Sequence, residues 1–173
     1  EAARQRMLPG KSPGPDGIPT DALKGLPAMT ILMQLCFTFM LRHSVYPLVW
    51  GSALLRALLK PGKPKHEASS LRGIRLMSAL ASWFGRVLDN KLRQAWEPDP
   101  EQFGFRSETG CSEAVALLIA LILSRTLEGK RLYVLWVDLR TAFPSLSRPI
   151  LIKKMYQCGV GLGLCKMMLA ILD

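Results

Sequence analysis

An apolar run that ends at an acidic residue places the strongest constraint on how this chain folds. Residues 132–137, LYVLWV, are rich in β-branched and aromatic side chains, and Asp138 follows them directly. Such a run favours a buried strand over a helix, because these side chains pack well on a pleated surface. A carboxylate at the end of a buried strand is costly to desolvate unless a cation or strong donors meet it. The pattern therefore predicts either a metal ligand or a helix N-cap at Asp138.

The residues around this acid resemble a motif of a known family. The string VDLRTAF, residues 137–143, resembles the first palm motif of reverse transcriptases, above all those of non-LTR retrotransposons and group II introns. The resemblance implies that Asp138 coordinates two catalytic Mg²⁺ ions, with the backbone carbonyl of Leu139 as a further ligand. It also implies that Phe143 is the aromatic gate that disfavours a ribose 2′-hydroxyl. Magnesium prefers such hard oxygen ligands, and two metal ions stabilise both oxygens of in-line phosphoryl transfer. Pro144 stands where the family usually has Asp, which changes the local turn.

The composition is that of a folded, basic protein. Its 173 residues suffice for one domain or a large part of one, and a hydrophobic content of 49% argues against a disordered chain. The formal charge of +10 favours a polyanionic partner, of which phosphate backbones are the commonest kind. An acidic membrane surface is the weaker alternative, because the basic residues are spread along the chain.

Neither disulfides nor a membrane span is expected. The four cysteines lack the spacing of zinc ligands, and three lie in apolar or helical contexts, which favours buried free thiols and an intracellular setting. The most apolar windows, residues 29–41 and 114–123, are shorter than the roughly 20 residues of a membrane-spanning helix, so we expect buried helices there. Residues 1–8 lack the apolar core of a signal peptide.

The first distinctive loop is KSPGPDGI, residues 11–18. Its prolines and glycines are typical of a rigid turn, and a helix capped by Thr20 or Asp21 is expected to follow. The string also resembles the segment that opens the fingers region of non-LTR reverse transcriptases. A helical pattern then covers residues 22–43, and Pro27 predicts a break or a fresh helix start within it.

A β-hairpin with a basic connection is predicted next. Residues 53–59 are apolar, residues 71–76 form a second strand candidate, and the connection 60–70 contains three lysines. A charged connection is usually an ordinary solvated loop. The alternative is a clamp for the triphosphate of a nucleotide, since lysine supplies a point charge and arginine a bidentate fork.

The second strand of this hairpin again resembles the family. Its string RGIRL, residues 72–76, resembles an Arg-Pro-Ile-x-Leu element. The resemblance implies that Arg72 contacts the phosphates of the incoming nucleotide and that Lys60 is a second cationic contact. Gly73 replaces the usual proline and Arg75 a usually small residue, which alters the expected geometry of the clamp.

Most of the remaining chain has helical patterns. The string QFGFR, residues 102–106, resembles an element on the template side of the family's fingers–palm junction. The aromatic ring of Phe105 and the guanidinium of Arg106 can stack bases and hold backbone phosphates, although Phe105 can equally be a core anchor. Helices are predicted over residues 78–96, 112–127, 150–158 and 164–172.

The resemblance extends over nearly the whole chain but implies only part of a polymerase domain. Reverse transcriptases carry adjacent acids on a later palm hairpin, and this sequence contains no Asp-Asp pair. We therefore expect a helix-rich α+β fold with fingers over about residues 1–130 and the start of the palm over residues 131–173. One carboxylate and one carbonyl leave the two-metal Mg²⁺ site incomplete.

The function implied is RNA-directed DNA synthesis by the full-length protein, with this fragment inactive alone. The implied partners are an RNA template, a DNA primer and deoxynucleoside triphosphates, with no membrane. The alternative is a degenerate remnant that binds nucleic acid without catalysis.

Overall fold

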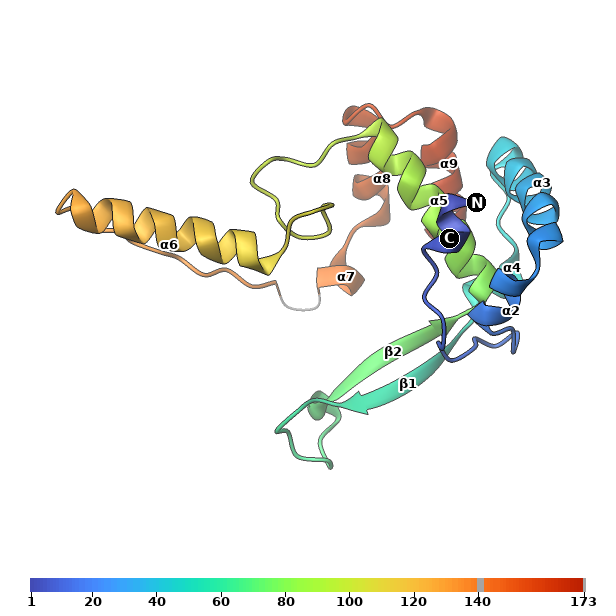
Figure 1. Ribbon diagram of the computed structural model, residues 1–173, viewed down its shortest axis with the longest axis horizontal. Coiled ribbons are helices and arrows are strands. Elements are labelled where there is room, and N and C mark those ends of the chain that lie inside the picture. Colours follow the sequence, from blue (N-terminus) through green and yellow to red (C-terminus); the bar gives the residue numbers. More distant parts are fainter. Residues whose placement is uncertain (140–141, 173) are drawn as a thin grey trace. The chain divides into compact units, whose positions relative to one another are not determined.

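The computed structural model describes residues 1–139 and 142–172. These residues form a helix-rich α+β protein with one two-stranded sheet, as the sequence predicts (Figure 1). The chain divides into two units, of which the first comprises Glu1–Trp96 and Arg148–Asp173 and the second comprises Glu97–Ser147. None of the helices within the described ranges is long and apolar enough to cross a membrane.

Local signals in the sequence set the ends of the longest helices in the first unit. Helix α3 has Pro27 at its start, where a missing N–H costs nothing, and Ser44 follows its end in the left-handed conformation (φ 52°). Ser78 caps α5 by accepting hydrogen bonds from the backbone amides of Leu80 and Ala81. The predicted helix start at Pro27 and the predicted α5 are thereby confirmed. The helices of this unit are α1 (Ala2–Gln5), α2 (Thr20–Gly25), α3 (Pro27–His43), α4 (Leu48–Gly51), α5 (Ala79–Ala95), α8 (Arg148–Gln157) and α9 (Leu162–Leu172).

An aromatic cluster contributed by α3, α4 and α5 forms the centre of the first unit. The ring centroid of Phe37 lies 5.5 Å from that of Trp83 and 5.1 Å from that of Phe84, whose side chain is completely buried. The ring of Tyr46 lies 5.9 Å from that of Trp50 in an edge-on arrangement. Burial raises the pKa of the Tyr46 phenol above its ordinary value. Aromatic pairs of this kind add to the apolar burial that holds the helices together.

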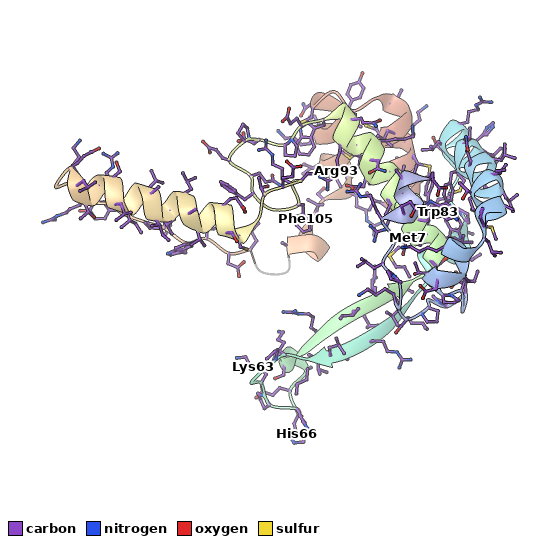
Figure 2. All side chains as sticks on the ribbon, in the orientation of Figure 1. Met7, Lys63, His66, Trp83, Arg93 and Phe105 are labelled. Atoms are coloured by element: carbon purple, nitrogen blue, oxygen red, sulfur yellow. The ribbon has the colours of Figure 1, made fainter. Side chains whose placement is uncertain are left out.

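Apolar side chains from the other helices extend this core. Met7, Trp83 and the fully buried Met167 of α9 belong to one cluster (Figure 2 labels the first two). Near the start of the chain, Arg4 of α1 is buried and its guanidinium donates to the carbonyl oxygen of Lys24 at 3.2 Å. The first residues are thereby tied to α2.

The loop at residues 11–18 packs tightly against the base of the hairpin. Gly14 is buried, and a Cβ there would lie 2.6 Å from the Ser78 nitrogen and closer still to the Met77 carbonyl. Only glycine fits this approach without a backbone shift. The carboxylate of Asp21 accepts a hydrogen bond from the Gly10 amide at 3.0 Å and does not cap α2. The predicted cap at Thr20 or Asp21 is therefore wrong, because Pro19 precedes the helix and makes no side-chain cap.

The sheet is the predicted hairpin. Strand β1 (Ala53–Leu59) pairs antiparallel with β2 (Leu71–Met77), and a short 3₁₀ helix, η1 (Ala68–Ser70), precedes β2. Figure 1 shows the two strands as a long ribbon that extends away from the helices of the first unit. The hairpin predicted from the sequence is confirmed.

The second unit contains helix α6 (Cys111–Leu127) and the short helix α7 (Ala142–Ser145). The Glu113 carboxylate accepts a hydrogen bond from the Gly110 amide at 2.7 Å at the start of α6. At its end, Arg125 and Lys130 form ion pairs with Glu128. No residue of α6 is buried, so the predicted burial of residues 114–123 is wrong, although the predicted helix forms. Apolar composition alone does not supply a packing partner.

The cysteines also differ from expectation. All four are free, as predicted, but only Cys165 of α9 is buried. The expectation of buried thiols is therefore wrong for the other three, because an apolar or helical context does not by itself supply a packing partner. The exposed cysteines are Cys36, Cys111 and Cys158.

Candidate functional site

The hairpin has two faces that carry different cations. In the antiparallel register, Arg72 lies opposite Leu58 and Arg56 lies opposite Ile74. Side chains of directly paired residues share a face and alternate along each strand, so both arginines lie on one face. Arg75 lies one residue out of step and therefore belongs to the other face. The hairpin thus places cations on both of its sides.

Lys60 holds the connection between the strands through one backbone and one side-chain hydrogen bond. Its amide donates to the Ser70 carbonyl at 2.8 Å, and its ammonium donates to the Ser69 carbonyl at 2.7 Å. The side chain is half-buried. Farther along, Lys63 and His66 are exposed at the end of the ribbon (Figure 2). The predicted basic tip is present, with Lys60 anchored at its base.

The two predicted nucleotide contacts on the hairpin lie in different surroundings. The side chain of Arg72 is exposed on β2 and makes no ion pair with any residue that the structure describes. The ammonium of Lys60 already donates to a carbonyl and has two further donors to offer. Both positions suit a phosphate oxygen, and their role as nucleotide contacts stays a prediction.

Sequence reasoning missed Arg56. It is a single charge within an otherwise apolar strand, ALLRALL, and only the register shows that it shares a face with Arg72. The signal available in the sequence was the alternation of side chains along each strand, because directly paired residues lie on the same face of the hairpin.

The segment before Asp138 does not form the predicted buried strand. Residues 131–139 have no regular secondary structure, and the apolar side chains of residues 132–137 are between 38% and 85% exposed. Their backbone groups make no hydrogen bond to another described residue. The propensity of these residues suits a pleated surface, but a strand forms only when a neighbouring strand takes up its N–H and C=O groups. The prediction of a buried strand is wrong for this structure.

The acid itself is accessible. Asp138 and Leu139 are both exposed. A carboxylate and a backbone carbonyl are hard oxygen donors of the kind that Mg²⁺ takes, so their chemistry fits this metal. Among the described residues, no group of three or more potential metal-binding side chains comes together. Magnesium requires six ligands, so these two donors alone do not complete a magnesium site.

Phe105 and Arg106 lie in the loop before α6. Phe105 has a positive φ of 60° and its side chain is 86% exposed, which excludes its alternative role as a core anchor. Arg106 is partly buried, and its guanidinium donates to the Asp99 carbonyl at 3.2 Å and lies 3.6 Å from a carboxylate oxygen of Glu97. These contacts fold the loop back on itself and occupy part of the guanidinium.

The aromatic gate predicted at Phe143 is only partly described. Its backbone belongs to α7, and its side chain lies outside what the structure describes. Its role stays a prediction.

Comparison with known proteins finds relatives that match most of the chain. The probable RNA-directed DNA polymerase from transposon BS of Drosophila melanogaster is 33% identical over 150 residues, which are 83% of this chain and 16% of that protein. The corresponding protein of the X-element of the same species is 32% identical over 143 residues, 80% of this chain and 16% of its own length. Over most of its length, the chain is similar to RNA-directed DNA polymerases of non-LTR retrotransposons.

A protein of another retroelement also matches most of the chain. The Pol polyprotein of the type-1 retrotransposable element R2 from Popillia japonica is 28% identical over 152 residues, 88% of this chain and 21% of that protein. No protein-family model matches the chain. The chain spans about one sixth of the length of the two Drosophila melanogaster transposon polymerase proteins.

Proposed function

We propose that this chain forms the fingers and the start of the palm of a reverse transcriptase that synthesises DNA on an RNA template. The observation that carries the proposal is the 33% identity to a transposon RNA-directed DNA polymerase over 83% of the chain. The division into fingers over about residues 1–130 and palm over residues 131–173 is part of the proposal. The boundary falls within the second unit of the structure. The full-length protein would use an RNA template, a DNA primer and deoxynucleoside triphosphates.

Asp138 is the proposed catalytic carboxylate. With the Leu139 carbonyl, it would hold Mg²⁺, which supplies charge stabilisation for the attacking and leaving oxygens of phosphoryl transfer. Its exposure leaves the carboxylate free to take such a ligand. The remaining ligands would come from water, from the nucleotide phosphates and from other acidic residues of the full-length protein.

The hairpin would bind the incoming nucleotide. Arg72 can form a bidentate contact to a phosphate, and Lys60 adds a point charge at the end of the same ribbon. Phe143 is the proposed sugar gate. Phe105 and Arg106 would contact the template, for which the exposed ring of Phe105 supports a stacking role.

Primer extension tests the proposal. A longer protein that contains this chain would be assayed on an RNA template with a DNA primer and Mg²⁺, with and without Asp138→Asn. Loss of a preorganised electrostatic contact at a reacting group lowers the rate by about 100-fold or more, so we expect a loss of at least that size. The matched control is Glu101→Gln, which neutralises another exposed acid of the second unit. Extension by Asp138→Asn at the rate of this control would contradict the catalytic assignment.

A second candidate is binding of nucleic acid without catalysis. It is favoured by the cations of the hairpin, none of which forms an ion pair with a described residue. The same longer protein distinguishes the two functions. Salt-sensitive binding of RNA and DNA without primer extension would support the second candidate.

A further inference from the structure

A cleft at the base of the hairpin gathers three cations. It has a volume of about 200 Å³ and lies between the loop at residues 11–18, the end of β2 and helix α5. Lys11 comes from the loop, Arg75 from β2 and Arg86 from α5. All three belong to the first unit. No acidic residue is among those that line the cleft.

The three cations have no partners among the residues that the structure describes. Neither Lys11, Arg75 nor Arg86 makes a side-chain hydrogen bond or an ion pair with them. Arg86 is half-buried, where an unpaired charge costs more than in open water. Like charges that line one cleft repel each other, and an anion bound between them attracts each of them and offsets this repulsion.

Two acids that lie in or close to the loop in sequence, Asp16 and Asp21, are not among the residues that line the cleft. The carboxylate of Asp16 accepts a hydrogen bond from the Ile18 amide at 3.2 Å, and that of Asp21 accepts one from the Gly10 amide at 3.0 Å. The first bond lies within the loop and the second joins the residue before the loop to α2, so both restrain the loop together with the tight approach of Gly14 to β2. The cleft is therefore formed before a ligand arrives, which reduces the entropy lost on binding.

Neutral donors complete the lining. Three residues that carry hydroxyl groups line the same cleft, one from the loop, one from α2 and one from α5. Guanidinium forks, an ammonium and hydroxyls are the groups with which proteins bind phosphate oxygens. The hydroxyl residues are Ser12, Thr20 and Ser82.

The size of the cleft indicates how much of a ligand it can enclose. Pockets that enclose a whole small molecule usually measure about 300–1,000 Å³. A cleft of about 200 Å³ suits one phosphate group of a larger molecule better than an entire nucleotide. Arg75 also lies on the face of the hairpin opposite to Arg72, so this cleft is separate from the proposed nucleotide contacts.

We propose that this cleft binds one backbone phosphate of a nucleic-acid strand through Arg75, Arg86 and Lys11. The inference rests on the proposed function, because it takes the strand to be a polynucleotide that a reverse transcriptase handles. It adds a second anion position to the hairpin, on the side away from Arg72.

The test measures binding of fluorescein-labelled single-stranded RNA and DNA to the 173-residue chain by anisotropy between 50 and 200 mM NaCl. Hydrogen bonds to charged groups are strong enough that losing one weakens binding by about 10-fold, so we expect this loss in Arg75→Gln and in Arg86→Gln. Each substitution should also lower the salt slope by about 0.7, the contribution of one phosphate contact to a single strand. Arg86→Lys keeps the charge but not the fork, and should lie between Arg86→Gln and the unaltered chain.

The matched control is Lys153→Gln, which removes one exposed charge from α8 in the same unit, outside the cleft. Its affinity should fall by less than about 2-fold, as expected for an exposed charge that contacts no phosphate. Circular dichroism of each variant checks that it folds. Arg75 is exposed on the hairpin, so Arg75→Gln provides a folded variant even where Arg86→Gln destabilises α5.

Three outcomes would contradict either the phosphate site in the cleft or the proposed function on which it rests, and they can be told apart. Equal losses in Arg75→Gln and Lys153→Gln would refute the cleft while leaving the proposed function intact. A second outcome is that Arg86→Gln weakens binding of a deoxynucleoside triphosphate or of inorganic phosphate but leaves strand binding unchanged. This result would show that the cleft takes a free anion, and it would also refute the inference. Absence of strand binding by the unaltered chain at 50 mM NaCl would instead contradict the nucleic-acid role itself.

Discussion

Gly14→Ala tests the packing that joins the loop at residues 11–18 to the hairpin. The added Cβ would lie 2.6 Å from the Ser78 nitrogen, so the loop or β2 must move by at least about 0.8 Å to restore an ordinary contact of 3.4 Å. The opposing atoms belong to the backbone and cannot rotate away as a flexible side chain would. Overpacking of this kind costs about 1–3 kcal/mol, and we expect a loss of about 2–3 kcal/mol in the free energy of unfolding.

Urea unfolding followed by tryptophan fluorescence measures this loss. With a urea dependence of about 1–3 kcal/mol per M for a small protein, the midpoint should fall by about 1–2 M. The control is Gly85→Ala in α5, where a Cβ has nothing within 4 Å. There the midpoint should rise, because alanine is favoured over glycine in a helix by about 0.5–1 kcal/mol. A Gly14→Ala midpoint equal to or above that of the unaltered chain would refute the packing argument.

Three further predictions concern stability. Ser78→Ala removes the cap of α5 and should lower the free energy of unfolding by about 1 kcal/mol in the same urea assay. Phe84→Ala removes a completely buried ring and should cost about 3–5 kcal/mol, whereas Phe39→Ala, at a ring that is 58% exposed, should change stability by about 0.5 kcal/mol or less. Because burial raises the pKa of Tyr46, the folded state holds its proton to higher pH than the unfolded state, and this contribution to stability is lost as the pH rises above about 10. Unfolding at pH 9 and pH 11 should therefore show a smaller decrease for Tyr46→Phe than for the unaltered chain; equal decreases would contradict the assignment.

Elements whose signals are local could be predicted from the sequence. Pro27 marks the start of α3, and a polar residue followed by an amphipathic pattern marks α5. Two apolar or alternating strands around a Pro- and Gly-containing connection predict the hairpin and its basic tip. In each case the residues that determine the element lie within it or beside it.

Features that depend on distant partners could not be predicted in this way. The run at residues 132–137 has strand propensity, but propensity does not reveal whether another strand accepts its hydrogen bonds. Helix α6 was expected to be buried because it is apolar, and burial requires an opposing surface. Lys11, Arg75 and Arg86 line one cleft because Gly14 packs against the end of β2. This packing joins segments that are distant in the sequence, so no single stretch of the sequence predicts it.

The alternation of the hairpin also limits how its sequence can change. Inserting or deleting one residue within β1 or β2 reverses the orientation of every later side chain relative to its partner strand. Between Arg72 and Arg75 in β2, such a change would bring the two arginines to the same side of the ribbon. Length variation among related elements should therefore concentrate in the connection at residues 60–70, where an added residue leaves both strands in register.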